Sequence, residues 1–333
     1  MPAPGVRARL FDADGRDREV TLSVGLTSTL TDRQLLWIDL DTRDVNELEA
    51  VATAVALGDH LVVRLAQEIG RAGLTQYREH IHLTLEAMDR PRKSGGDGQQ
   101  PVRLEIDVVA GRNWVVTIHD GPSAALERLD QATEGETRLG ALDAAGFLAS
   151  IVDEVLDGYL DLAESIGQEI DRLDEQALRT KPLRSEPRHD VLSSIVSLRR
   201  TIGTMRRTLA PHRIAFAALA RPEMDLHEEL GRPWPDLSDR LERAVNAVEN
   251  LRDLLLGTFD IHMGRTTQDA NEVMKVLTLI SAVLLPAIVL AGVMGMNFPL
   301  AFFDDTGNFW LVLGAMALFG TTLLAAARWR GWV

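Results

Sequence analysis

In the C-terminal third of the chain, side chains that could contact or conduct cations form a line, recurring at intervals of seven residues and, around Asn271, at intervals of three and four. These intervals place side chains on one face of an α-helix. The line passes from carboxylates through amides and hydroxyls to apolar groups: Asp239, Asn246, Asp253, Asp260, Thr267, Asn271, Met274, Thr278, Leu285 and Gly292. Rings of acidic groups favour cations, and apolar constrictions can gate by dewetting. Several copies of this helix around one axis would therefore line a cation-conducting tube, with Asp253 and Asp260 as candidate metal contacts.

The acidic half of this line also has a plainer interpretation. Asp239 to Asp253 is equally well described as the solvated face of a coiled-coil stalk. That interpretation does not extend to Asn271 and Thr278, because polar side chains that enter a membrane need water or polar partners. A membrane-anchored coiled-coil adaptor stays open as an alternative, although it has no need of a polar line that continues into the span.

At the end of the line lies the tripeptide Gly295-Met296-Asn297. Asn297 is either a helix C-cap or, in a ring of copies, one of several amide oxygens that contact the water shell of a cation. The tripeptide follows the uncharged stretch 276–296, and a second uncharged stretch covers 309–327. About 20 apolar residues span a bilayer as a helix. The two stretches are therefore predicted transmembrane helices, joined by the external loop 297–308.

The flanking charges predict the orientation of this hairpin. Arg265 and Lys275 precede the first span, the basic tail 328–333 follows the second, and the connecting loop contains no Lys or Arg. The positive-inside rule then places both termini in the cytoplasm of a bacterial inner membrane. Residues 1–30 lack the apolar core of a signal peptide, so the part before the first span is expected to be cytoplasmic.

Composition excludes several classes of function. The 333 residues include no cysteine, which excludes disulfides, thiolate metal sites and cysteine nucleophiles. The net charge of −14 argues against a nucleic-acid partner and favours cations. Neither a phosphate-binding glycine motif nor a nucleophile–base pattern is visible, so we expect no enzyme and no cofactor other than a transported ion.

The remaining chain divides into a cytoplasmic α/β domain over 1–140 and a long-helix stalk over 141–275. In the first part, period-two alternation and β-branched content predict strands at 7–11, 19–24, 35–40, 80–88, 102–110 and 113–120. Helices are predicted from a cap at Asp44 to Leu57 and over 60–72. The predicted fold class is an α+β membrane protein with long stalk helices and two C-terminal transmembrane helices.

Three long helices are predicted in the stalk, over about 143–178, 189–219 and 236–296. The third would be about 90 Å long, too long for a compact domain. It carries an apolar seam in heptad spacing. The seam contains Leu237, Leu241, Ala244, Val248, Leu251, Leu255, Thr258 and His262. One copy cannot cover both this seam and a membrane-embedded Asn271, whereas a closed ring can.

The C-terminal residues resemble the CorA family of divalent metal ion channels. The resemblance rests on GMNF at 295–298, NEVMKVLT at 271–278, LP at 285–286 and AGVMGMNF at 291–298. It implies a homopentameric funnel whose first membrane helix lines the pore. It also implies that the GMN loop is the selectivity filter and captures hydrated Mg²⁺, with Co²⁺ and Ni²⁺ also permeating. The family's apolar constriction matches Met274 and Leu277, and its polar pore positions match Asp260 and Asn271.

The chain departs from the family at the cytosolic metal-sensing site. Many members carry an acidic pair there, whereas the matching stretch here ends in Arg64. The other sensing carboxylate is matched by Asp236 or Asp239. The second interpretation is that the chain belongs to a zinc-transporting branch of the superfamily, in which transport can be coupled to protons. Its loop tends to continue from the Asn with two glycines, whereas Phe298-Pro299 follows here, which favours the magnesium type.

Overall fold

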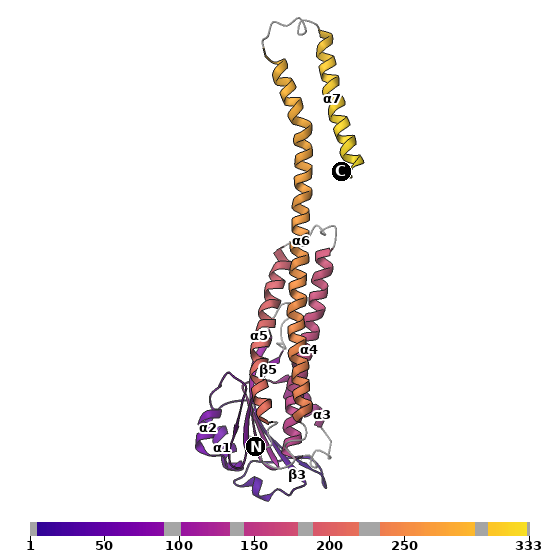
Figure 1. Cartoon of the computed structure of the whole chain (residues 1–333). Helices are drawn as coiled ribbons and strands as arrows, with labels where there is room; N and C mark the ends of the chain where they lie inside the picture. Colours follow the sequence, from indigo (N-terminus) through magenta and orange to yellow (C-terminus); the bar gives the residue numbers. More distant parts are fainter. Residues whose placement is uncertain are drawn as a thin grey trace. The chain divides into compact units, whose positions relative to one another are not determined.

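The computed structural model describes residues 5–89, 101–133, 143–178, 189–219, 234–296 and 306–331. The chain forms two compact units, Met1–Thr258 and Phe259–Val333. The first unit contains a β-sheet, its covering helices and most of a helical stalk. The second contains two long apolar helical segments (Figure 1).

The sheet has seven strands in the order β2-β1-β3-β7-β6-β5-β4. Strands β3 and β7 run parallel, and all the other neighbours are antiparallel. The strand bounds are β1 Val6–Asp12, β2 Arg18–Glu19, β3 Gln34–Leu40, β4 Gly73–Gln76, β5 Ile81–Asp89, β6 Val102–Ala110 and β7 Trp114–His119. Side chains alternate between the two faces, and both faces are buried against helices or loops.

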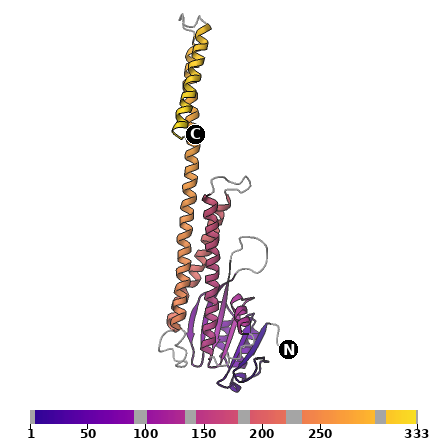
Figure 2. The same cartoon turned by 90° about the vertical axis from the view of Figure 1, so that its right-hand side faces the viewer.

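Different helices cover the two faces. One face packs against α3 (Ala124–Thr133) and α4 (Ala144–Leu178), with Trp37 and Phe147 in contact at a ring-centroid distance of 5.3 Å (Figure 2). The other face carries an apolar cluster under α1 (Val45–Val55) and α2 (Asp59–Leu65). The predicted cap at Asp44 is confirmed, because its carboxylate accepts hydrogen bonds from the backbone N–H groups of Asn46 and Glu47.

The structure differs from the sequence predictions at four places in this domain, one of which is the unpredicted strand β4. Helix α2 ends at Leu65 instead of reaching residue 72, because Gly70 adopts a left-handed conformation and the chain then enters β4. Strand β2 is two residues long; the Val20 N–H still donates to the Ala8 carbonyl at 2.9 Å, and the side chains of Val20 and Leu22 pack against the apolar cluster under α1. Helix α3 was not predicted; its apolar side chains Ala125, Leu126 and Leu129 occupy less than three turns.

The three long helices of the stalk are confirmed. They are α4, α5 (His189–Leu219) and α6 (Trp234–Met294), with the last 61 residues long. The apolar seam of α6 is buried from Leu237 to Thr258 against α4 and α5 of the same chain. His262, the next position, is partly exposed. The seam therefore serves packing within one subunit and not a separate coiled coil.

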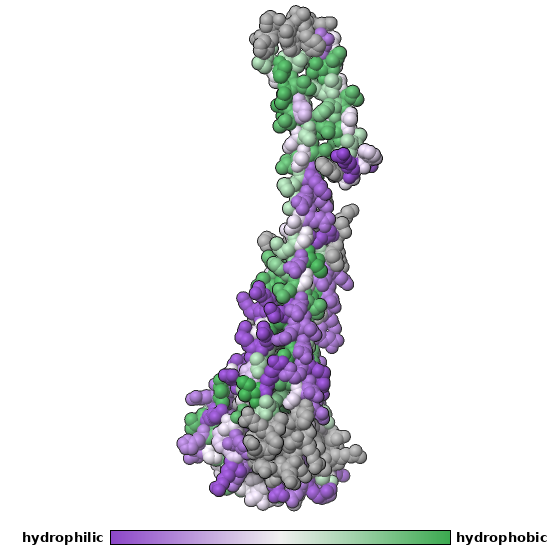
Figure 3. Space-filling view, in the orientation of Figure 1, coloured by the Kyte–Doolittle hydropathy of each residue, from purple (hydrophilic) through white to green (hydrophobic). Residues whose placement is uncertain are grey.

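The second unit holds the rest of α6 and α7 (Thr306–Trp329). Both helices are long and apolar enough to cross a membrane. Figure 3 shows their hydrophobic surface between the polar ends of the unit. The predicted loop 297–308 lies largely outside the described residues, and so does Asn297.

Candidate ion pathway along α6

The predicted pore-facing side chains of the second unit lie on an exposed face of α6. Met274, Leu277 and Leu285 are 62%, 61% and 64% exposed, which is high for large apolar side chains. Asn271, Thr278 and Gly292 are exposed as well, and Thr278 satisfies its hydroxyl by donating to the carbonyl of Met274 at 2.8 Å. The structure thus leaves the whole predicted pore line of this unit uncovered within one chain.

Helix α7 covers a different face of α6. The partly buried side chains of α6 between residues 276 and 294 are Leu279, Val283, Pro286, Ala287 and Met294. At about 100° per residue, Val283 lies about 140° around the helix from Thr278. A Cβ placed on Gly320 of α7 would lie 3.5 Å from Cγ1 of Val283. The packing of α7 therefore turns the polar line of α6 away from its partner helix.

The acidic positions of α6 are also exposed. Asp260 lies in the first turns of the second unit, and Asp236, Asp239 and Asp253 lie on the part of α6 that belongs to the first unit. Among the described residues, no three His, Asp or Glu side chains are grouped so that they could hold a metal. A single chain therefore does not bring these carboxylates together, and a shared cation site would need several copies.

The described part of the predicted selectivity motif closes the end of α6. The backbone N–H of Gly295 donates to Ala291 at 3.0 Å, and that of Met296 donates to Val293 at 3.2 Å. The side chain of Met296 is half-exposed. Asn297, the predicted ion contact, follows directly but lies outside the described residues, so its role stays a prediction.

Arg64, at the position of the expected metal-sensing acid, lies in the last turn of α2. Its neighbours Leu61, Val62 and Leu65 are buried against the sheet, whereas Arg64 is exposed. The side chain thus points away from its own domain into solvent.

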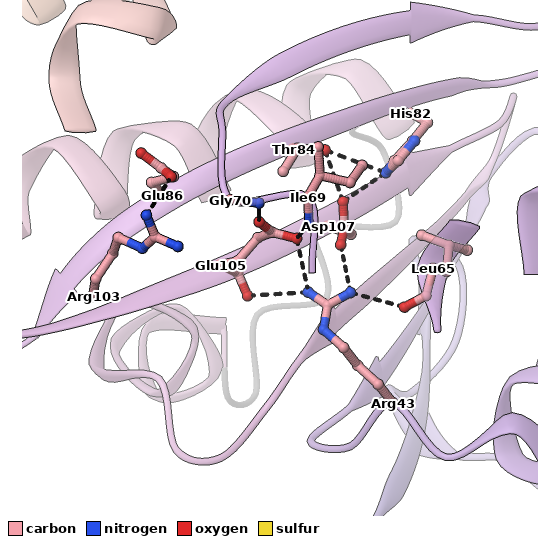
Figure 4. Close-up of polar contacts among 10 residues, drawn as sticks. All are labelled: Arg43, Leu65, Ile69, Gly70, His82, Thr84, Glu86, Arg103, Glu105 and Asp107. Carbon is pink, nitrogen blue, oxygen red and sulfur yellow. Dashed lines mark hydrogen bonds and ion pairs between the residues drawn. The ribbon is translucent and has the colours of Figure 1, made fainter. Parts of the chain in front are cut away.

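A polar cluster that the sequence reasoning missed anchors the end of α2 to the sheet (Figure 4). Arg43 donates from Nη1 to the Leu65 carbonyl at 2.8 Å and to Oδ2 of Asp107 at 2.7 Å. The carboxylate of Glu105 accepts from the backbone N–H groups of Ile69 and Gly70, at 2.8 and 2.5 Å. These contacts hold the segment after α2 against β6, and so they set the position of the helix that carries Arg64.

Burial, hydrogen bonds and neighbouring charges together shift the pKa values of the two buried carboxylates in this cluster. Burial opposes the charge of Asp107, but hydrogen bonds from His82 and Arg43 together with their charges lower its pKa. Burial raises the pKa of Glu105 despite its two backbone donors. A sequence signal was present, because His82, Thr84 and Glu86 alternate along β5 and Arg103, Glu105 and Asp107 alternate along β6. Charged groups at every second position of a buried strand indicate a polar layer.

The chain was compared with known proteins at the levels of family, sequence and structure. Residues 32–326 match the family described as CorA-like Mg2+ transporter protein. The cobalt/magnesium transport protein CorA of Thermotoga maritima is 33% identical over 152 residues, a match that spans 45% of this chain and 42% of that protein. The divalent cation transporter CmaX of Pseudomonas aeruginosa is 27% identical over 90% of this chain and 89% of its own.

The fold is shared along the whole chain. The complete structure of the CorA magnesium transporter of Methanocaldococcus jannaschii superposes with a TM-score of 0.78 at 19% identity and covers all of both chains. In sequence, the corresponding protein is 24% identical over 91% of this chain and 92% of its own. The predicted arrangement of an α/β domain, a long stalk helix and two C-terminal apolar helices is confirmed.

Proposed function

Because the chain belongs to the family of CorA-like Mg2+ transporter proteins, we propose that it is a passive channel for divalent cations. The ion is Mg²⁺ first, with Co²⁺ and Ni²⁺ also permeating. The channel is a homopentamer in a bacterial inner membrane, with both termini in the cytoplasm. The two C-terminal helices make the protein a membrane protein, and α6 lines the pore.

One observation carries this proposal: the pore line of α6 is exposed, and α7 lies on another face. In a single copy, the Asn271 amide would face lipid at the membrane border, which is costly. A ring of copies turns the same face toward a common axis, where water and the neighbouring amides satisfy it. A membrane-anchored adaptor would gain nothing from this arrangement.

The order of groups along α6 suggests how an ion passes. At the outer end, the Gly295-Met296-Asn297 motif provides neutral oxygens that bind a hydrated ion without trapping it. Mg²⁺ releases its waters reluctantly, so contacts through its water shell suit it. Leu285 and Gly292 line the following apolar section, and Met274 with Leu277 forms the constriction that gates by dewetting.

Beyond the constriction, rings of Asn271 and Asp260 receive the ion, followed by Asp253 in the stalk. Repeated carboxylates concentrate cations on the cytoplasmic side of the pore. Each ring contributes one ligand from each subunit, which fits the dispersed acidic side chains of a single chain. Asp236 and Asp239 are the candidate carboxylates for a regulatory ion between subunits.

The proposal is tested by flux into liposomes that contain the purified full-length protein. Mg²⁺, Co²⁺, Ni²⁺ and Zn²⁺ are compared, each with and without a proton gradient, and protein-free liposomes are the control. We expect Mg²⁺ entry that needs no proton gradient. Flux of Zn²⁺ alone, driven by protons, would instead identify a zinc transporter, and the absence of any cation flux would contradict transport altogether.

A further inference from the structure

Two edges of the helical stalk carry opposite charge. Helix α4 has nine acidic residues and one arginine, whereas α5 has five arginines and no Asp or Glu between Val191 and Leu219. Within the first unit, α4 and α5 lie side by side and contact each other, and α6 packs beside both of them (Figures 1 and 2). Since the whole chain is acidic, with a net charge of −14, a helix with five arginines and a single acidic residue, Asp190, is a local exception.

Some of these charges are paired inside the chain: Glu154 of α4 pairs with Arg128 of α3 at 2.9 Å, and the other described pairs join α4 or α5 to α6. Arg213 and Arg206 of α5 pair with Glu242 and Glu249 of α6. On the other side, Arg240 of α6 pairs with Asp153 at 2.9 Å and with Asp157, both on α4. These contacts also show which residues of the three helices lie at the same position along the stalk axis, called their height below.

Arg207 and Arg200 lie on the edge of α5 that points away from α6. Arg207 is about 100° around the helix from Arg206, and its guanidinium reaches only Thr204 of its own helix. In the described part of the chain, neither Arg200 nor Arg207 forms an ion pair. The exposed side chains beside them are apolar, with Val196 at 53% and Ile214 at 67% exposed. A face of arginine and aliphatic residues is typical of a protein interface.

The acidic stripe of α4 has matching spacing. On α4, Glu164 and Asp171 are seven residues apart, and both are exposed without an ion pair in the described part of the chain. The interval between Arg200 and Arg207 is also seven. Two helices that lie side by side and antiparallel can therefore form both ion pairs at once.

The heights of these residues agree. Arg206 is level with Glu249 of α6, so Arg207 is level with about residue 248. A Cβ on Gly167 would lie 3.7 Å from Leu251, and Glu164, three residues earlier on the parallel helix α4, is therefore also level with about residue 248. By the same count of seven, Arg200 and Asp171 are level with about residue 255. Rotation about an axis along the stalk preserves height, so level residues meet.

We infer that in the proposed ring the acidic edge of α4 packs beside the basic edge of α5 of the next subunit. Arg207 then pairs with Glu164, and Arg200 with Asp171, of that second copy. The inference rests on the ring of the proposed function and names the faces that close it. Such a head-to-tail contact is heterologous, the type that closes into rings.

The cysteine-free chain allows a direct test by cross-linking. The full-length double variant Arg207→Cys/Glu164→Cys is treated in detergent with a short bis-maleimide, because an arginine–glutamate pair exceeds the reach of a disulfide. We expect a ladder of covalent oligomers up to the full ring. The matched control is Arg206→Cys/Glu164→Cys, whose first cysteine is adjacent in sequence but faces α6, and we expect loss of the ladder there.

Charge reversal tests the ion pairs themselves. Arg207→Glu alone and Glu164→Arg alone should each weaken the oligomer at low salt, where repulsion between like charges is least screened, and the two together should restore it. Native mass spectrometry measures the oligomeric state of the wild type, and so distinguishes a wrong assignment of the contacting faces from the absence of a ring. A ring without the specific ladder, or without rescue, overturns the assignment of faces but leaves the channel proposal standing. A wild-type monomer overturns the ring on which both depend.

Discussion

Val283 of α6 lies against Gly320 of α7, where the two membrane helices of the second unit pack together. The missing Cβ of Gly320 would lie 3.5 Å from Cγ1 of Val283, an ordinary contact distance. Small residues let helix backbones approach closely in membranes. The pair therefore sets how α7 supports α6 on a face other than the pore line.

Enlarging Gly320 should disturb this support. Gly320→Ala fits the observed space, whereas Gly320→Leu overpacks the contact at a cost of about 1–3 kcal/mol. We expect Gly320→Leu to reduce Mg²⁺ flux several-fold and Gly320→Ala to leave it near wild type. The control is Gly314→Leu on the same helix, where no atom lies within 4 Å of the added Cβ. Equal losses at both positions would show that the contact has no special role.

Removing the amide of Asn297 should abolish transport without preventing assembly. The substitution Asn297→Ala deletes the neutral oxygen proposed to bind the hydrated ion but leaves the apolar spans unchanged. We expect little or no Mg²⁺ flux from rings that remain intact by native mass spectrometry. Asn250→Ala, an exposed amide of the stalk, is the control for loss of an amide as such. Transport at the wild-type level by Asn297→Ala would contradict the filter assignment.

Cytosolic Mg²⁺ should regulate the proposed channel weakly. A metal site between subunits needs carboxylates from both sides, and Arg64 offers a fixed positive charge that can pair with Asp236 or Asp239 of a neighbour. We expect the protease resistance of the stalk to be insensitive to millimolar Mg²⁺ in the wild type. The variant Arg64→Glu should gain Mg²⁺-dependent protection, and Val63→Glu, on the adjacent exposed position, should not. Strong protection of the wild type would refute the idea.

The α/β domain should lose stability in alkaline solution through His119. Burial favours the neutral ring, but the hydrogen bond and charge of Asp39, with the Gly121 carbonyl, raise the pKa of His119. A group whose pKa is raised in the folded state contributes stability below its unfolded pKa of about 6.5 and loses it as pH rises through the folded value. Each unit of that shift is worth about 1.4 kcal/mol.

The measurement is the thermal unfolding midpoint of the full chain in detergent between about pH 6 and about pH 9. We expect a lower midpoint at the alkaline end for the wild type. In His119→Gln this decrease should be smaller, because the ionisable ring is gone. An identical pH dependence of the two proteins would show that the His119–Asp39 pair does not couple folding to protons.

Local patterns were sufficient for the helical and membrane parts. The uncharged stretches, the heptad seam and the cap at Asp44 depend on helix periodicity and on neighbouring residues, which are readable along the chain, although the predicted seam extended to His262, one seam position beyond the buried part. The shared face from Asn271 to Gly292 follows from the same periodicity. The exposure of this face does not follow from periodicity, because exposure depends on where α7 packs.

Only the tertiary structure decided the features that join distant segments. Glu105 holds the segment after α2 by accepting the Ile69 and Gly70 N–H groups from 35 residues away or more, and Arg43 reaches Asp107 across 64 positions. The sequence predicted the α6 seam but not its partner, which is α4 and α5 of the same chain. The matching heights of Arg207 and Glu164 are likewise invisible in sequence, because the register between two packed helices is determined by which side chains interlock.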